Sequence, residues 1–141
     1  MHPANQEAAI VLLGLRGSGK TTLGRLLATV LSSAFVDLDD RTRARTGHAT
    51  VGEAFRAIGE QGFRAAEADA LGEVLATAAP RTVIALGGGT PTAPGARALL
   101  ESAAASGRIR IALLEAPPAV LGARLQAAPG DRPLLIGAAF V

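Results

Sequence analysis

The stretch Gly14-Leu15-Arg16-Gly17-Ser18-Gly19-Lys20-Thr21 decides the fold, because it matches the pattern G-x-x-x-x-G-K-[ST] without adjustment. Lys20 is the only lysine in a chain of 141 residues, and every other strongly basic side chain is an arginine. A compact ammonium on a flexible stem reaches the β- and γ-phosphates of a nucleotide, whereas a guanidinium is a wider, planar group. The stretch therefore predicts a phosphate-binding P-loop.

The residues on either side of this loop favour the same interpretation. Residues 8–13 (AAIVLL) are apolar throughout, which predicts a buried strand, and residues 20–31 carry leucines and valine at helical spacing. Small residues at 17–19 let backbone N–H groups close around phosphates, and the helix N-terminus adds a positive dipole end. The hydroxyl of Thr21 suits Mg²⁺. The alternative is a glycine turn that happens to hold a lysine.

Strands and helices alternate along the rest of the chain, which predicts one α/β domain over residues 1–141. The expected architecture is three-layered, a parallel sheet between two layers of helices, with ligands at the carboxyl ends of the strands. Further strands are expected at 34–38, 82–86 and 109–114, and helices at 39–46, 51–58, 60–78, 94–105 and 117–127.

Composition excludes several classes of protein. Hydrophobic residues make up 49% of the chain and charged residues 18%, which is typical of a globular protein, and without cysteine neither disulfides nor thiolate zinc sites can form. With aromatic residues at 3% and a net charge of +2, nucleic-acid binding is not expected. Arg41, Arg43 and Arg45 are interpreted as a solvated face rather than a polyanion site. Residues 8–13 are too short to span a membrane, so a cytoplasmic protein is expected.

Two carboxylates follow the second expected strand. Asp37 and Asp39 are separated by one residue, so strand alternation would direct both side chains to the same side. One can reach Mg²⁺ through water, and the other can orient an acceptor hydroxyl. The alternative is that Asp39 or Asp40 caps the next helix.

Gly87-Gly88-Gly89 follows the third expected strand. Three glycines expose backbone amides and leave room for a ligand against the main chain, although a flexible turn would have the same composition. This strand lacks the terminal aspartate of a Walker B element, which argues against a GTPase or a motor ATPase.

Two arginines are candidates for binding anions. Arg64 and Glu67 are three residues apart on one expected helix, so the carboxylate could fix the guanidinium for a substrate carboxylate. A weak surface pair is the alternative. Arg132 lies beside Pro133 in a loop, where it could close over phosphates or face solvent.

Five segments in order resemble the shikimate kinase family: GLRGSGKTTLG, FVDLDD, TGHATVGEAFRAIGEQGFRAAE, LGGG and DRPLL. The third segment is the most specific, because it contains the F-x-x-x-G-E-x-x-F-R-x-x-E arrangement. The resemblance covers about residues 8–137.

The resemblance implies transfer of the ATP γ-phosphoryl group to the 3-hydroxyl of shikimate, with Mg²⁺, in aromatic amino-acid biosynthesis. It implies a substrate-binding helical region at about 39–78, a lid loop at about 128–136 and a monomer. The implied catalytic residues are Lys20, Asp39 and Arg132. The implied ATP ligands are Gly17, Ser18, Gly19, Lys20, Thr21, Thr22, Arg124 and Arg132. Shikimate would contact Asp39, Arg64, Gly87, Gly88 and Gly89, while Thr21 and Asp37 would hold Mg²⁺.

The resemblance also implies strand order 2-3-1-4-5, of which the fifth strand is absent from this sequence. We therefore expect an exposed edge at residues 108–114, with lower stability and a tendency to associate. Weaker substrate binding is expected too, because a second substrate-binding arginine has no counterpart here.

Three functions remain open from the sequence. The first is a shikimate kinase, impaired or not. The second is another small-metabolite kinase such as a gluconate kinase, which the FRxxE helix and the triple glycine argue against. The third is a non-catalytic module that binds a nucleotide or a metabolite, which the presence of Lys20, Thr21, Asp37, Asp39 and Arg64 argues against.

Overall fold

The computed structural model describes residues 7–14 and 19–115. Several predictions from the sequence lie outside these residues. They are the helix at 117–127, the lid loop at 128–136, and the roles of Gly17, Ser18, Arg124 and Arg132.

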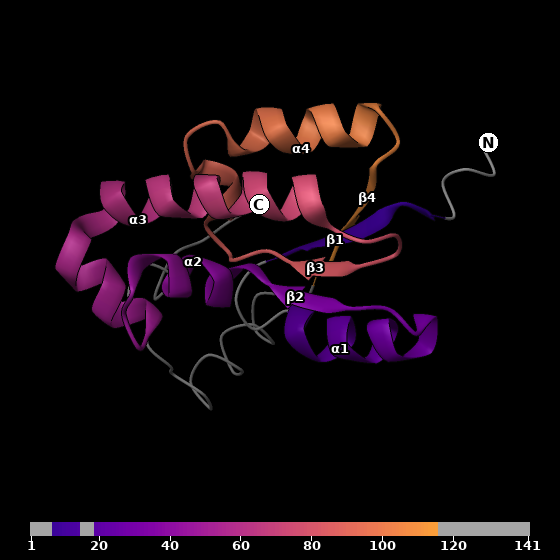
Figure 1. Ribbon diagram of the computed structural model, residues 1–141, viewed down its shortest axis with the longest axis horizontal. Coiled ribbons are helices and arrows are strands. Elements are labelled where there is room, and N and C mark those ends of the chain that lie inside the picture. The colour runs from indigo at the N-terminus through magenta and orange to yellow at the C-terminus, as the bar shows by residue number, and fades with distance from the viewer. Residues whose placement is uncertain (1–6, 15–18, 116–141) are drawn as a thin grey trace.

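A four-stranded parallel sheet in the order β2-β3-β1-β4 forms the centre of the described fold. The α/β class and the predicted strand order are therefore confirmed. Figure 1 shows α3 and α4 on one side of the sheet and α1 on the other. The elements are β1 (Ala9–Leu13), α1 (Lys20–Leu31), β2 (Phe35–Asp37), α2 (Leu38–Thr46), α3 (Val51–Thr77), β3 (Val83–Ala85), the 3₁₀ helix η2 (Thr90–Thr92), α4 (Ala96–Ala105) and β4 (Ile109–Leu113).

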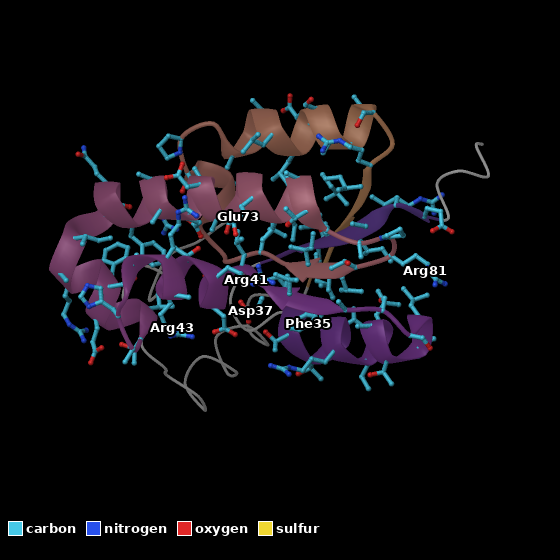
Figure 2. The ribbon with its side chains drawn as sticks, in the orientation of Figure 1. Phe35, Asp37, Arg41, Arg43, Glu73 and Arg81 are labelled. Atoms are coloured by element: carbon cyan, nitrogen blue, oxygen red, sulfur yellow. The ribbon has the colours of Figure 1, made fainter. Side chains whose placement is uncertain are left out.

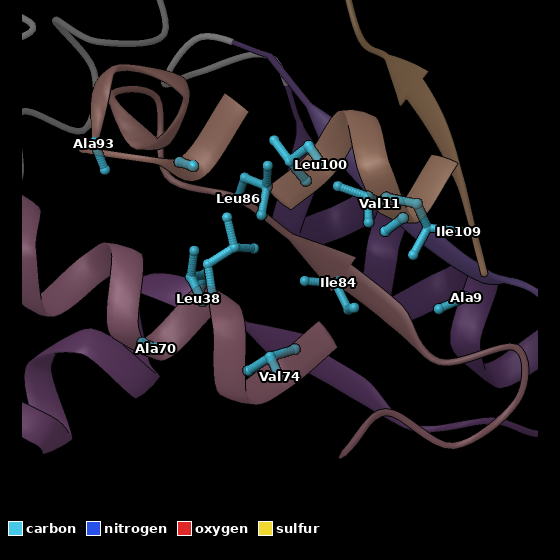
Figure 3. Close-up of a cluster of buried hydrophobic side chains, with 13 residues drawn as sticks. Ala9, Val11, Leu38, Ala70, Val74, Ile84, Leu86, Ala93, Leu100 and Ile109 are labelled. Carbon is cyan, nitrogen blue, oxygen red and sulfur yellow. The ribbon is translucent and has the colours of Figure 1, made fainter. Parts of the chain in front are cut away.

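The two faces of the sheet bury two separate apolar clusters. Val11 of β1 and Ile84 of β3 pack with residues of α3 and α4, including Val74 and Leu100 (Figure 3). The strand neighbours of these residues turn the other way, and Leu12 packs against α1 in the second cluster. Successive side chains of a strand point to opposite faces, so a strand covered by helices on both sides must be apolar at every position, as the sequence of β1 is.

The helix α3 bends at Gly59, which has φ 74° and ψ 174°. A positive φ of this kind is accessible to glycine at little cost. The two halves match the helices predicted at 51–58 and 60–78. Thr50 caps the N-terminus of this helix, because its side chain accepts a hydrogen bond of 3.0 Å from the backbone N–H of Glu53.

The second strand is shorter than predicted. Asp37 ends β2, where it is visible in Figure 2, and its Oδ1 accepts a hydrogen bond of 3.0 Å from the backbone N–H of Asp39. This contact caps α2, which begins at Leu38. Asp39 therefore belongs to the first helical turn, and the prediction that strand alternation aligns Asp37 with Asp39 is wrong. Capping of this helix by Asp39 or Asp40 is also wrong, since Asp37 is the cap.

The helix predicted to begin at Pro94 begins later. Residues 90–92 form a 3₁₀ turn first, and α4 starts at Ala96 after Gly95, which has φ 79°. A 3₁₀ turn is a common connector of this length. Its consequence is that the residues after the triple glycine fold back tightly at the carboxyl end of β3.

The strand β4 pairs on one side only, with β1, within the described part of the chain. Ile111 and Leu113 are 41% and 63% exposed there. The exposed edge expected at this strand is thus present among the described residues, whereas the association expected from it stays a prediction. None of the described helices combines the length and apolarity needed to cross a bilayer.

Candidate active site

The carboxyl ends of three strands meet at one edge of the sheet. Ala85 of β3 pairs with Leu12 of β1 on one side and with Asp37 of β2 on the other. Neighbouring strands lie about 4.8 Å apart, so the loops that follow these residues start close together. The predicted phosphate loop, the predicted metal carboxylate and the triple glycine are therefore at the same edge.

The phosphate side of this edge is the N-terminus of α1. Gly19 is the N-cap residue of the helix, with φ 94°, and no side-chain cap is present among the described residues. The first intrahelical bond runs from the N–H of Leu23 to the carbonyl of Gly19, so the N–H groups before it have no acceptor within the helix. Such a turn attracts anions through its N–H groups and its dipole.

Lys20 and the threonines after it lie within this first turn. The Nζ of Lys20 donates to the carbonyl oxygen of Gly14, 2.5 Å away, so the ammonium lies next to the residue that follows β1. Thr21 and Thr22 are exposed. The turn thus presents a cation and two hydroxyls at the position where the sequence predicts phosphates and Mg²⁺.

The acceptor side of the edge is a buried ion pair that extends to a third residue. Nη1 of Arg64 donates to Oε1 of Glu67 at 2.6 Å, with the two side chains only 13% and 1% exposed. The other carboxylate oxygen of Glu67, Oε2, accepts a hydrogen bond of 2.8 Å from the hydroxyl of Thr90. The interpretation of Arg64 and Glu67 as a weak surface pair is therefore wrong.

The triple glycine lies directly against these charged groups. A Cβ at Gly87 would stand 2.5 Å from Oδ1 of Asp39 and 3.1 Å from Oε2 of Glu67, and a Cβ at Gly89 would overlap the guanidinium of Arg64. Separations below 3.0 Å essentially do not occur for real Cβ atoms, so a side chain at residue 87 or 89 would force Asp39 or Arg64 to shift. The triple glycine thus allows charged side chains to pack directly against its backbone.

Asp39 completes the acceptor side from α2. The residue is 6% exposed, and its Oδ1 faces Gly87. Asp39 and Glu67 come from different helices and approach the same glycine, so two buried carboxylates and one guanidinium gather within a small volume. An arrangement of this kind is suited to binding a molecule that carries both hydroxyls and a carboxylate.

The residues predicted to hold Mg²⁺ have suitable donor atoms. The described residues contain no group of three or more acidic, His or Cys side chains that would form a complete cage. Mg²⁺ does not require one, since it keeps several waters and takes further oxygens from phosphates. The hydroxyl of Thr21 and the carboxylate of Asp37 are oxygen donors of this type. A carboxylate has about four lone-pair sites, so the capping role of Asp37 leaves the metal role open.

One residue of this site was missed from the sequence. Thr90 lies beyond the glycines and joins Glu67 across 23 positions of the chain. A threonine that follows three glycines gives no periodic or spacing signal of such a contact. The structure brings together Asp39, Arg64, Glu67, Gly87 and Gly89 as one cluster. Gly88 lies between the two glycines that contact this cluster.

Comparison with known proteins decides the family. The sequence model of the shikimate kinase family matches residues 16–139. The chain belongs to the shikimate kinase family. Shikimate kinases are ATP-dependent phosphotransferases with an alcohol acceptor, as the resemblance implied.

Two curated shikimate kinases show how much of the sequence is shared. Shikimate kinase 2 of Yersinia pseudotuberculosis is 40% identical over 134 residues, which cover 94% of this chain and 72% of that protein. The shikimate kinase of Symbiobacterium thermophilum is 51% identical over 80 residues, which cover 57% of this chain and 44% of that protein. The chain therefore aligns with less than half of one relative and with about seven tenths of the other.

Solved structures agree with the family assignment. A shikimate kinase from Acinetobacter baumannii in complex with shikimate superposes with a TM-score of 0.80 at 34% identity, over 94% of this chain and 70% of that one. A shikimate kinase from Bacteroides thetaiotaomicron gives 0.77 at 36% identity with the same coverage. A gluconokinase from Sinorhizobium meliloti gives 0.53 at 18% identity over 91% of this chain and 69% of that one, a likeness of fold alone.

Proposed function

We propose that this chain transfers the γ-phosphoryl group of ATP to the 3-hydroxyl of shikimate. The observation that carries the proposal is the buried contact of Arg64 with Glu67 against Gly89, at the same sheet edge as a P-loop. A small hydroxy acid needs a fixed cation for its carboxylate and a carboxylate for its hydroxyls, and this edge supplies both.

Arg64 is the proposed ligand of the shikimate carboxylate. A guanidinium has five N–H donors in a fixed plane, and Glu67 occupies one side of it. Nε of Arg64 is buried, with no hydrogen-bond partner among the described residues. A buried donor without a partner is costly, so an incoming carboxylate would relieve that cost. The backbone of Gly87, Gly88 and Gly89 is proposed to line the same pocket.

Asp39 is the proposed partner of the shikimate hydroxyls. Its Oδ1 lies over Gly87, close to the Arg64 and Glu67 pair. A carboxylate at this place can hold the reacting hydroxyl in line with the phosphoryl group, and it can accept the proton that the hydroxyl loses on phosphorylation. Positioning of the nucleophile is, with charge neutralisation, one of the two main contributions that a protein makes to this kind of transfer.

The phosphate side is proposed to bind ATP through the N–H groups of residues 17–22 and the ammonium of Lys20. Thr21 and Asp37 would hold Mg²⁺, Asp37 through a water molecule, and the metal would neutralise charge on the phosphates when bound. Lys20 would neutralise the charge that develops during transfer, which stabilises the transition state more than the ground state.

Four further expectations from the sequence belong to the same proposal. Arg132, in a lid at about 128–136, would close over the phosphates, and Arg124 would contact the adenine. The chain would act as a single kinase domain over residues 1–141. It would act as a cytoplasmic enzyme, monomeric unless the edge at β4 pairs, without nucleic-acid or membrane partners. A role in aromatic amino-acid biosynthesis follows from the proposed substrate.

An ATP-consumption assay tests the proposed function. The purified chain is given ATP with shikimate, with gluconate or without an acceptor, each with and without Mg²⁺. We expect ADP release that requires shikimate and Mg²⁺ together. Nucleotide binding without turnover would favour the non-catalytic module, and release that depends on gluconate would favour the other small-metabolite kinase.

A further inference from the structure

We infer that Thr90 is a positioning residue for the acceptor, because its hydroxyl fixes the carboxylate that holds Arg64. The inference rests on the proposed function, in which Arg64 binds the substrate carboxylate. The three side chains form one chain of contacts, from the Thr90 hydroxyl to Oε2 of Glu67 at 2.8 Å and from Oε1 of Glu67 to Nη1 of Arg64 at 2.6 Å.

Burial makes the contact of Thr90 with Glu67 strong. Thr90 and Glu67 are both fully buried, at 0% exposure of each residue. In such surroundings water does not replace a lost partner, and a hydrogen bond to a charged group contributes more than one between neutral groups. Without the hydroxyl, Oε2 of Glu67 would lose the partner that fixes the plane of its carboxylate.

The geometry at Gly87 gives the hydroxyl a second effect. Oε2 of Glu67 and Oδ1 of Asp39 both lie within 3.1 Å of the position that a Cβ of Gly87 would take. These two carboxylate oxygens repel each other when both are charged, and the repulsion is strong at low dielectric. The Thr90 hydroxyl donates a hydrogen bond to Oε2, which reduces this repulsion and keeps Glu67 turned toward Arg64.

The backbone around Thr90 holds its hydroxyl at the required place. The residue is the first of η2, and its N–H donates to the carbonyl of Gly87 at 3.1 Å. The same short turn therefore sets both the glycine surface and the hydroxyl that stabilises Glu67. Loss of the hydroxyl should weaken binding of the acceptor and leave binding of the nucleotide, at the start of α1, unchanged.

A comparison of two buried threonines tests this inference. Thr90→Val removes the hydroxyl beside Glu67, and Thr82→Val removes a hydroxyl of similar burial, 2% exposed, that donates to the carbonyl of Ala79 at 2.7 Å. Thr82 precedes β3, at the end opposite to the site. Both variants should lower the urea midpoint of unfolding, so stability alone does not distinguish them.

Steady-state kinetics distinguishes the two variants. Thr90→Val should raise the KM for shikimate roughly tenfold and leave the KM for ATP within about twofold, the size expected when one hydrogen bond to a charged group is lost. Thr90→Ser should restore the shikimate KM, and Thr82→Val should leave it unchanged. An equal effect of Thr90→Val and Thr82→Val, or no recovery with Thr90→Ser, would overturn the inference.

A measurement without turnover separates this inference from the proposed function. NMR of the arginine side chains, assigned with an Arg64→Lys variant, should show restricted rotation of the Arg64 guanidinium in the wild type and in Thr90→Ser. Free rotation is expected in Thr90→Val, or in Thr90→Ala if the valine variant does not fold. Unchanged Arg64 signals would overturn the positioning role. A response to Thr90→Val in a chain that binds no shikimate would support that role and overturn the proposed function.

Discussion

The two halves of the site differ in how completely the protein itself builds them. On the acceptor side, Asp39, Glu67 and Thr90 are buried, and Nη1 of Arg64 lies 2.6 Å from Oε1 of Glu67. On the nucleotide side, Thr21 and Thr22 are exposed, and none of the residues that the structure describes caps the first turn of α1 through its side chain.

The difference indicates which half is fixed before ligands arrive. Charged groups in a buried site need partners within the protein, because water cannot supply them. Groups at an exposed helix N-terminus can be satisfied by water until phosphates replace it. The acceptor half is thus preorganised by side chains, whereas the proposed role of the N–H groups at the start of α1 is to bind the phosphates of the nucleotide. Substitutions on the two sides should accordingly have different signatures.

Lys20→Ala should have the largest effect, and it should be on turnover. The ammonium is proposed to act on charge that develops during transfer, so its loss should lower kcat by about a hundredfold to a thousandfold, the range for one electrostatic donor. Circular dichroism and urea unfolding should be close to the wild type, because Lys20 is only half-buried. Lys20→Arg is the matched control, and it should not restore turnover, since a guanidinium has a different shape. Retained activity in Lys20→Ala would remove this residue from the site.

Glu67→Gln should have the next largest effect, and it should be on stability as well as on shikimate binding. The substitution keeps the size of the side chain and leaves Arg64 buried without its charged partner, which costs about 3–5 kcal/mol. Glu73→Gln is the matched control on the same helix. It breaks the pair of Glu73 with Arg45, whose side chains are 59% and 44% exposed at a distance of 3.0 Å.

Urea unfolding of these two variants measures the contrast between a buried and an exposed ion pair. The exposed pair of Glu73 should contribute less than about 1 kcal/mol. Similar losses of unfolding free energy in both variants would contradict the view that burial makes the acceptor half stable. A Glu67→Gln variant with wild-type stability and a wild-type KM for shikimate would contradict it as well.

Gly87→Ala should have a smaller and more local effect. The added methyl would push Asp39 and Glu67 apart, so we expect a roughly tenfold loss of kcat/KM for shikimate from misplacement of the acceptor groups. Gly72→Ala is the control, because its Cβ would meet only Leu99, at an ordinary 3.8 Å. That change lies within α3 and should raise stability by about 0.5–1 kcal/mol. A wild-type kcat/KM for shikimate in Gly87→Ala would show that the triple glycine is not part of the acceptor site.

The sequence predicted much of this fold because its signals are local. The bounds of α1, the division between the helices at 51–58 and 60–78, and the end of α2 at residue 46 follow from local patterns, and the structure confirms them. Buried strands covered on both faces are also easy to recognise, because every residue in them is apolar. The strand order came from the family resemblance and not from the residues.

The predictions that were wrong or missing concern two kinds of residue. Some residues can adopt either of two local structures, and others make contacts with residues that are far away in the sequence. Asp37 could extend a strand or cap a helix, and its hydrogen bond to the N–H of Asp39 favours the cap. The pair of Arg64 and Glu67 was visible from its spacing, but whether it was buried was not. Thr90 could not be found, because its contact with Glu67 exists only after β3 has brought the two together.

The solitary lysine has a practical consequence for chemistry performed on the whole protein. Acylating reagents that target primary amines can react with only two groups in this chain, the α-amino group and Nζ of Lys20. A second label in the mass of the intact product therefore requires modification of Lys20, because one label accounts for the α-amino group. A reagent of this kind is a direct probe of whether Lys20 is covered.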